Sequence, residues 1–241
     1  MARTIFFACG DSYPADRPAE ELLRGLLEGP DSDFVTHGDL FNSKTGTGGP
    51  GQIDLKAKVL EQAIRDCGPG REIFLIGRSA GARTATIAAG KCPVTAIVSI
   101  FYPFRDLQRQ LEPKRFAHLR TLTVPTLMLQ GAYDPYGGLE VTEFYQLSES
   151  IRLKFIEGHH RLKIAAEEGA FIPPMIVDFI KGGWRETGRD LENFDEDFYL
   201  TTHPDVAEAI AAGRFISGED HFRKQGRKEC RVYRLRYDGQ V

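Results

Sequence analysis

The chain has 241 residues, of which 41% are hydrophobic and 27% charged, a composition ordinary for a soluble globular protein. The net charge of −3 argues against a nucleic-acid partner, and no apolar run approaches the length of a membrane span, so we expect no membrane partner either. The four cysteines (Cys9, Cys67, Cys92 and Cys230) have neither metal spacing nor a disulfide framework, which predicts a reduced, cytoplasmic location.

Short apolar runs alternate with helical patterns as far as about residue 182. The apolar runs predict strands at Thr4–Ala8, Phe34–His37, Ile73–Ile76, Ala96–Ile100, Thr126–Gln130 and Leu153–Ile156. The amphipathic segments predict helices at Glu20–Leu27, Asp54–Cys67, Ala80–Ala89, Leu139–Ser148 and Ile164–Phe171. Because the strands are continuous apolar runs with little alternation, they are typical of a parallel sheet covered on both faces. The order predicts an α/β fold with about six mostly parallel strands.

The strand pattern stops near Lys181, so we divide the chain into a domain at residues 1–182 and a small, mainly helical C-terminal module at residues 183–241. An acidic stretch begins at Glu186 and a basic one at Arg214, and aromatic residues remain frequent in both. Because a disordered tail is poor in aromatic residues, we expect the module to fold. Its expected core is Phe198, Tyr199, Leu200, Val206 and Ile210.

The pentapeptide Gly77-Arg78-Ser79-Ala80-Gly81 lies between the third predicted strand and an Ala-rich helix. A strand, a tight G-x-S-x-G turn and a helix form the setting of a nucleophile elbow. The glycines are needed because the crossing of strand and helix leaves no room for larger side chains. Ser79 is therefore predicted as a nucleophile, because a plain helix N-cap would not need a glycine on either side.

A serine nucleophile needs a base within hydrogen-bonding distance and a carboxylate that orients the base. Asp134 follows the fifth predicted strand, and His159 and His160 follow the sixth, in the chain order serine, acid, histidine. In a parallel sheet these strand ends lie along one edge. Asp134 alone, before Pro135, is equally compatible with a turn, and only one histidine can face Ser79. Together the residues predict a Ser-His-Asp triad.

Acyl transfer also needs donors that stabilise an oxyanion. The first expected donor is the backbone N–H of Ala80, at the N-terminus of a helix. We assign the second to the backbone N–H of Asp11, in the loop after the first strand. The common pattern in that loop begins His-Gly, whereas this chain has Cys9-Gly10 followed by an acidic residue. This departure puts the efficiency of the hole in question.

Two further features near the predicted site have open alternatives. The segment Gly46-Thr47-Gly48-Gly49-Pro50-Gly51 is either an unconstrained surface loop or a loop that borders the site. Arg78 and Arg83 either are solvated or ion-paired residues or favour an anionic group on the substrate. No sequence pattern calls for a cofactor or a metal ion.

Several segments together resemble one group of enzymes: Phe74–Arg83, Tyr102–Phe104, His118-Leu119, Pro125–Leu127, Gln130-Gly131, Asp134–Gly137 and His160–Lys163. They span about residues 4–182 and resemble the small, lidless α/β-hydrolases of the dienelactone-hydrolase-like branch. Within that branch the chain is most similar to the subgroup related to a testis-expressed hydrolase and to a non-catalytic subunit of a histone-acetylation complex. The resemblance implies Ser79 as nucleophile, where dienelactone hydrolases use cysteine, Asp134 as acid and His160 as base.

The C-terminal part resembles something else. Its matching segments are Phe194–Leu200, Pro204–Val206, Gly213–Phe215, Ser217-Gly218, His221-Phe222 and Gly226. They are similar to a short module that bacterial proteins carry beside methyltransferases, glycosyltransferases and secreted polypeptides. This resemblance implies a bacterial source and an interaction or targeting element, through which a protein partner would bind.

These features predict a serine hydrolase that cleaves a carboxylic ester, a thioester or a related acyl bond of a small-molecule substrate. The alternative is a hydrolase-fold scaffold of weak or no activity that binds a protein or ligand partner. The altered oxyanion loop favours the scaffold, and the intact Ser-Asp-His set argues against it.

Overall fold

A computed structural model describes residues 2–49, 51–107, 112–182, 194–226, 229 and 231. Its central element is a single sheet with the strand order β2-β1-β3-β4-β5-β6, in which every neighbouring pair is parallel. The strands are β1 (Arg3–Ala8), β2 (Ser32–Val35), β3 (Glu72–Arg78), β4 (Ala96–Ile100), β5 (Thr126–Gly131) and β6 (Ile151–Ile156). The predicted α/β class with six parallel strands is confirmed.

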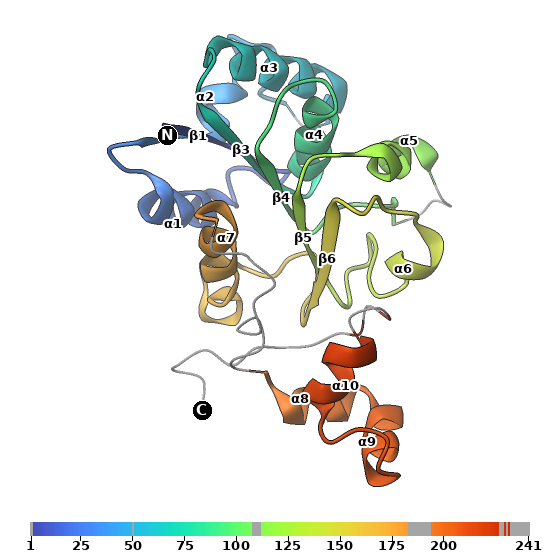
Figure 1. The fold of residues 1–241 in the computed structure, drawn as a ribbon. Coiled ribbons are helices and arrows are strands. Elements are labelled where there is room, and N and C mark those ends of the chain that lie inside the picture. Colours follow the sequence, from blue (N-terminus) through green and yellow to red (C-terminus); the bar gives the residue numbers. More distant parts are fainter. Residues whose placement is uncertain are drawn as a thin grey trace.

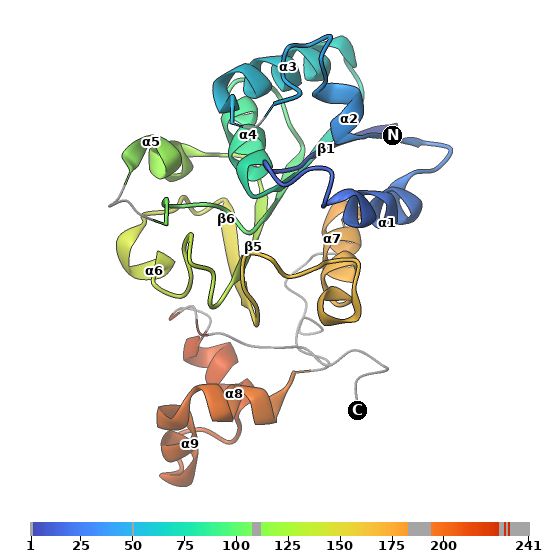
Figure 2. The same ribbon diagram turned by 180° about the vertical axis from the view of Figure 1, so that it is seen from behind.

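Helices cover both faces of the sheet, as predicted. Figure 1 shows α1 (Arg17–Leu27) and α7 (Ile172–Ile180) on one side. The other side carries α2 (His37–Leu40), α3 (Ile53–Asp66) and α4 (Ala80–Ala89), as the reverse view also shows (Figure 2). Short helices at Pro113–Phe116 (α5) and Val141–Phe144 (α6) and 3-10 turns at Ala117–Thr121 and Glu167–Gly169 complete this part. No helix within the described residues is long and apolar enough to cross a bilayer.

The four central strands, β1, β3, β4 and β5, are largely apolar because each contributes to two cores. In β1, Ile5 and Phe7 pack with α1 and α7, whereas Phe6 and Ala8 pack with α3 and α4. All four side chains are at most 3% exposed. Alternate residues of a strand point to opposite faces, so a strand buried on both faces loses the apolar–polar alternation of a half-exposed one.

Two predicted element boundaries are shifted in the structure. The strand predicted at Phe34–His37 ends at Val35, because Thr36 and Asp39 form a capping box that starts α2 at His37. The helix predicted at Leu139–Ser148 is reduced to α6. The Ser148 hydroxyl donates to the Leu122 carbonyl at 2.5 Å, and this bond holds the chain before β6 outside a helix.

The helix predicted at Ile164–Phe171 is wrong. That segment contains only the 3-10 turn Glu167–Gly169, and the helix begins later, at Ile172. Two prolines explain the shift, because Pro173 and Pro174 stand in the first turn of α7, where their missing N–H groups cost nothing.

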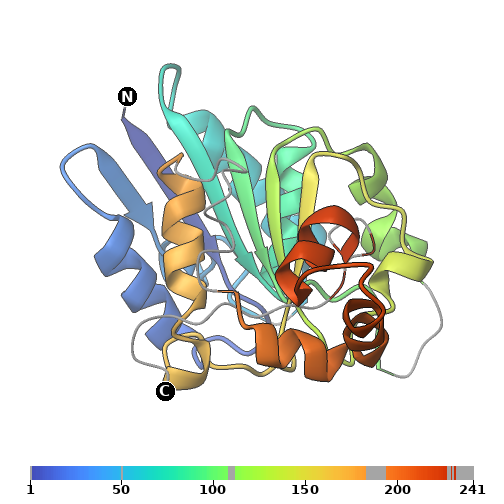
Figure 3. The same cartoon turned by 60° about the horizontal axis from the view of Figure 1, so that its bottom comes forward.

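The C-terminal part forms α8 (Glu196–Thr202), α9 (Pro204–Ala211), α10 (Gly218–His221) and a π-turn at Phe222–Gly226, at the β6 side of the sheet (Figure 3). Its core consists of Tyr199, Val206 and Phe222, with Phe194, Leu200 and Ile210 around them. Phe198 was expected in this core, but it packs against the apolar cluster of the first part. Residues 183–193, directly after the predicted boundary, and about half of the charged residues in the acidic and basic stretches lie outside the described residues.

Candidate active site

Ser79 stands in a strained turn between β3 and α4. Its φ of 53° and ψ of −124° are values that a non-glycine residue adopts only at a cost of about 1–3 kcal/mol. The Ser79 N–H donates to the Ile100 carbonyl at 2.9 Å, and its own carbonyl accepts from Ala82 at 2.9 Å. These bonds anchor the turn, so the strained backbone holds the hydroxyl at the carboxyl edge of the sheet.

Three glycines make room for this turn. A Cβ on Gly77 would lie 2.5 Å from the Cα of Ala82, and a Cβ on Gly81 would collide with the end of β1. Gly10, in the loop after β1, lies directly against Ser79, because a Cβ there would be 2.8 Å from the Cβ of Ser79. After β1 the chain adds β2 on one side of it, and from β3 onward it adds strands on the other side. The loops after β1 and β3 therefore meet where the strand order changes direction.

The structure brings Ser79, His160 and Asp134 into one hydrogen-bonded chain. The Oγ of Ser79 lies 2.8 Å from the Nε2 of His160, and the Nδ1 of His160 lies 2.8 Å from an Oδ of Asp134. Asp134 is 2% exposed and is fixed by the Tyr136 N–H at 2.8 Å and by the Gln130 amide at 3.2 Å. A buried carboxylate with two further donors orients the imidazole without turning to solvent.

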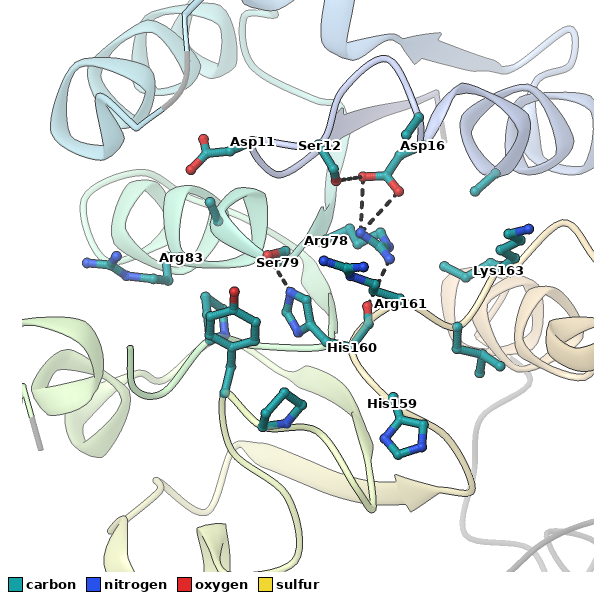
Figure 4. A pocket seen from close by; sticks show the side chains of 18 of the residues that line it. Asp11, Ser12, Asp16, Arg78, Ser79, Arg83, His159, His160, Arg161 and Lys163 are labelled. Carbon is teal, nitrogen blue, oxygen red and sulfur yellow. Dashed lines mark hydrogen bonds and ion pairs between the residues drawn. The ribbon is translucent and has the colours of Figure 1, made fainter. Parts of the chain in front are cut away.

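His159 lies apart from this chain. Its Nδ1 is 2.9 Å from the Tyr133 carbonyl, its side chain is exposed, and its ring lies 5.7 Å from the Tyr133 ring. Figure 4 shows its ring well away from Ser79, whereas the His160 ring points at the hydroxyl. Of the two adjacent histidines, the structure places His160 beside the Ser79 hydroxyl.

Arg78 connects the loops that carry the site. Its guanidinium forms an ion pair with Asp16 at 3.0 Å and donates to the His160 carbonyl at 3.0 Å. Its Cζ lies 5.6 Å from the centroid of the Phe101 ring. The Asp16 carboxylate also accepts from the Ser12 hydroxyl at 3.0 Å (Figure 4). The side chains of Arg78 and Asp16 are 8% and 10% exposed. Sequence reasoning had left Arg78 undecided, because its two partners lie 62 and 82 residues away.

The two expected oxyanion donors come from the helix that follows Ser79 and from the loop after β1. Ala80 is the first residue of α4, so its N–H is at a helix N-terminus. Asp11 lies in the loop after β1, and Figure 4 shows its carboxylate turned away from Ser79. An oxygen of that carboxylate accepts from the Gly51 N–H at 2.7 Å. This bond holds the Asp11 carboxylate on the side away from Ser79, and Gly51, at the end of the glycine-rich loop, lines the cavity beside Ser79.

A buried histidine, His37, supports the loop after β1, where this chain has Cys9-Gly10. The Cys9 N–H donates to Nδ1 of His37 at 3.0 Å, and the His37 N–H donates to Glu20. Burial, helped by the Lys56 ammonium, lowers the pKa of His37 to about 4, so this ring is neutral and accepts at neutral pH. Burial likewise raises the pKa of the Cys9 thiol, which keeps it unreactive.

An open cavity of about 1460 Å³ surrounds Ser79 and His160. Its size exceeds the roughly 300–1,000 Å³ common for small-molecule sites, so an extended substrate has room. Its wall includes Asp11, Gly51, Arg83, Tyr136, Arg161 and Lys163.

Comparisons with known proteins agree with this architecture. A family model described as "Alpha/beta hydrolase domain" matches residues 43–177, and no curated protein matches. A candidate alpha/beta-superfamily hydrolase from Xanthomonas campestris pv. campestris is 16% identical (TM-score 0.56, 76% of this chain, 99% of that one). An esterase domain from Rhodothermus marinus is 19% identical (TM-score 0.55, 75% of this chain, 86% of that one). A monoacylglycerol lipase from Paleococcus ferrophilus is 15% identical (TM-score 0.54, 74% of this chain, 94% of that one).

At these identities the solved structures show the same fold and nothing finer. The family model covers more than half of the chain, and its matched range contains the elbow and the two other members of the hydrogen-bonded chain. This protein therefore belongs to the alpha/beta hydrolase domain family.

Proposed function

We propose that this protein is a serine hydrolase that cleaves a carboxylic ester, a thioester or a related acyl bond through an acyl-enzyme. The observation that carries the proposal is the unbroken chain from Ser79 Oγ through the His160 imidazole to the Asp134 carboxylate, with 2.8 Å at each contact. Both distances lie within the range that proton transfer to a general base requires. A neutral imidazole protonated on Nδ1 donates to Asp134 and accepts from Ser79.

The first half-reaction makes the acyl-enzyme. The Ser79 oxygen attacks the substrate carbonyl carbon while Nε2 of His160 takes the hydroxyl proton. Asp134 stabilises the imidazolium that forms. The carbonyl oxygen becomes an oxyanion, which the N–H groups of Ala80 and Asp11 stabilise. The imidazolium then gives its proton to the leaving group as the bond from the carbonyl carbon to that group breaks.

The second half-reaction releases the acid. A water molecule replaces the leaving group, and His160 takes one of its protons as the water oxygen attacks the acyl carbon. The second tetrahedral oxyanion collapses, the bond to Ser79 breaks, and His160 returns the proton to the serine oxygen. The free site is regenerated, with no redox change and no group lost from the protein.

Labelling with a fluorophosphonate probe tests the proposal. The folded wild type is expected to label at Ser79, and Ser79→Ala and heat-denatured wild type are expected not to label, because only an activated serine attacks the probe. A folded wild type that does not label at Ser79 contradicts the serine mechanism. That result would favour the alternative, a hydrolase-fold scaffold that binds a protein or ligand partner.

We also propose that the chain belongs to the small, lidless, dienelactone-hydrolase-like branch and that residues 183–241 form a separate interaction or targeting module. The cluster of Tyr199, Val206 and Phe222 supports a module with a core of its own. The Glu196 carboxylate accepts from the backbone at the start of α10, and the hydroxyl of Tyr199 lies 3.0 Å from Nδ1 of His221. Deleting residues 183–241 is expected to leave labelling of Ser79 intact, because the proposed reaction uses no residue of the module.

A further inference from the structure

The cavity around Ser79 has more positive than negative side chains in its wall. Its permanently charged cations, among the described residues, are Arg78, Arg83, Arg115, Arg161 and Lys163. Its carboxylates are Asp11, Asp16 and Asp106. A cavity with charge of one sign raises the local concentration of ligands of the opposite sign.

Ion pairs account for two of these cations. Arg78 is paired with Asp16 at 3.0 Å, and Arg115 lies 3.3 Å from Asp106. No carboxylate of the described residues lies within ion-pair distance of Arg83, Arg161 or Lys163. The remaining acid, Asp11, accepts from the Gly51 backbone and does not balance this excess.

Arg83 is the informative member of this unpaired set. Arg161 and Lys163 are exposed, so hydration is enough to stabilise their charges. Arg83, by contrast, is half-buried on α4, one turn after Ser79. Its Nε is buried and has no hydrogen-bond partner in the described part of the chain. Burial lowers the pKa of Arg83, and so does the nearby positive Arg115, whereas Tyr102 and the carboxylates Glu112 and Asp54 raise it. The hydroxyl of Tyr102 interacts directly with its guanidinium group.

A half-buried guanidinium without a carboxylate at ion-pair distance is costly to keep, since it is partly removed from water and its nearest counter-charges, Glu112 and Asp54, act only from further away. Arginine is also the side chain best suited to grip a carboxylate or a phosphate through paired N–H groups. Figure 4 shows Arg83 and Arg161 on opposite sides of Ser79 and His160. Both guanidinium groups line the cavity that a substrate of Ser79 would occupy.

We propose that this site takes an anionic acyl compound, in which an ester or thioester carries a carboxylate or phosphate that pairs with Arg83. Arg161 and Lys163 contribute at the mouth of the cavity, where they attract the anion through solvent. The inference rests on the proposed serine hydrolase function and names its substrate class.

Matched ester probes test the preference. On the acyl side, mono-4-nitrophenyl adipate carries a carboxylate, and 4-nitrophenyl hexanoate is its neutral control. On the leaving-group side, 4-acetoxybenzoate and 4-acetoxyphenyl phosphate carry the two anions, and methyl 4-acetoxybenzoate is neutral. The measured quantity is the ratio of kcat/KM for the anionic probe to that for its neutral control. The probe with the highest ratio identifies the anion and its side of the scissile bond.

The wild type is expected to give a ratio above one for at least one anionic probe. Arg83→Gln is expected to lower that ratio about 10-fold or more, the range for a lost charge-assisted hydrogen bond, and Arg83→Lys, which keeps the charge, is expected to lower it less. Arg161→Gln, at an exposed position that leaves folding intact, is expected to lower it by a smaller factor. Arg152→Gln removes a charge at an exposed position of β6, outside the cavity, and is expected to leave the ratio unchanged.

Two results separate this inference from the proposed function. If the wild type cleaves the esters but no anionic probe is preferred, or if Arg83→Gln keeps the wild-type ratio while folded, the substrate inference is wrong and the hydrolase proposal stands. If the wild type cleaves none of the esters and does not label with a fluorophosphonate, the hydrolase proposal is wrong, and the substrate inference fails with it.

Discussion

The buried ion pair between Arg78 and Asp16 offers a test of how the histidine loop is held in place. Arg78 has two partners, because one guanidinium edge faces the Asp16 carboxylate and Nη2 donates to the His160 carbonyl at 3.0 Å. Replacing Arg78 by methionine removes both contacts while keeping much of the apolar stem. We expect Arg78→Met to lower both the stability of the protein and its turnover, for separable reasons.

The stability loss comes mainly from Asp16. Its side chain is 10% exposed, and after the substitution the Ser12 hydroxyl is its remaining side-chain donor in the described part of the chain. Removing one partner of a buried pair costs about 3–5 kcal/mol, because the other charge stays buried without compensation. Arg78→Met is therefore expected to lower the free energy of unfolding by about that amount.

A double variant separates positioning from stability. Arg78→Met combined with Asp16→Leu removes both charges, and such replacements are often neutral or stabilising. Asp16 makes no side-chain cap bond to α1, so the leucine removes no cap. The double variant is expected to be about as stable as the wild type. It still lacks the donor to the His160 carbonyl, so kcat/KM is expected to fall about 10- to 100-fold through misplacement of the base, mostly in kcat.

The assay combines urea unfolding with the hydrolysis of 4-nitrophenyl acetate. Arg78→Lys serves as the conservative variant, since an ammonium keeps the charge but cannot reproduce the planar fork that reaches both partners. Its activity is expected to lie between that of the wild type and that of the double variant. A double variant that is folded and has wild-type kcat and KM would refute the positioning role of Arg78.

Three further predictions follow from other parts of the structure. His160→Ala is expected to lower kcat on the order of 10³-fold and His159→Ala to change it little; the reverse order would contradict the choice of base. Gly81→Ala is expected to cost about 3 kcal/mol or more of unfolding free energy, because its methyl group collides with β1. Gly25→Ala, with open space around it in α1, should instead stabilise by about 0.5–1 kcal/mol in the same urea titration. The pKa of His37 is about 4 in the folded protein against an ordinary value of 6.5, so as the pH falls the unfolded chain binds the proton first. The contribution of the neutral ring to folding stability is therefore complete above pH 6.5 and is lost as the pH falls toward 4. Between about pH 7 and pH 4.5 this loss is about 2–3 kcal/mol, and unfolding curves of His37→Gln should lack that part of the pH dependence.

The parts of the fold that could be predicted from the sequence are those set by local patterns. The apolar runs locate all six strands, because a strand covered on both faces has few polar positions, and even the edge strands β2 and β6 keep a short apolar run. The parallel order then places the ends of β3, β5 and β6 at one edge of the sheet, which is why the sequence alone predicts that Ser79 and Asp134 lie near each other. Helix α7 was missed because Pro173 and Pro174 look like a stop, although prolines in a first turn start a helix.

The finer features of the site depend on contacts between distant residues. His159 and His160 are neighbours with the same chemistry, and their residue types alone did not decide which ring faces Ser79. The deciding contacts run from His160 to Arg78, 82 residues away, and to Asp134, 26 residues away. Sequence reasoning also left the roles of Arg78 and Arg83 open. The structure pairs Arg78 with Asp16, whereas Arg83 has no carboxylate partner among the described residues.

Trapping the acyl-enzyme is the most direct test of the central claim, that Ser79 attacks a carbonyl with His160 as base. The wild type is mixed with 4-nitrophenyl acetate, quenched with acid, digested and analysed by peptide mass spectrometry. The account predicts one acetyl group on Ser79 and a matching burst of 4-nitrophenolate, both absent in Ser79→Ala. Hydrolysis that proceeds equally in Ser79→Ala, with no acetyl group on the elbow peptide of the wild type, would contradict it.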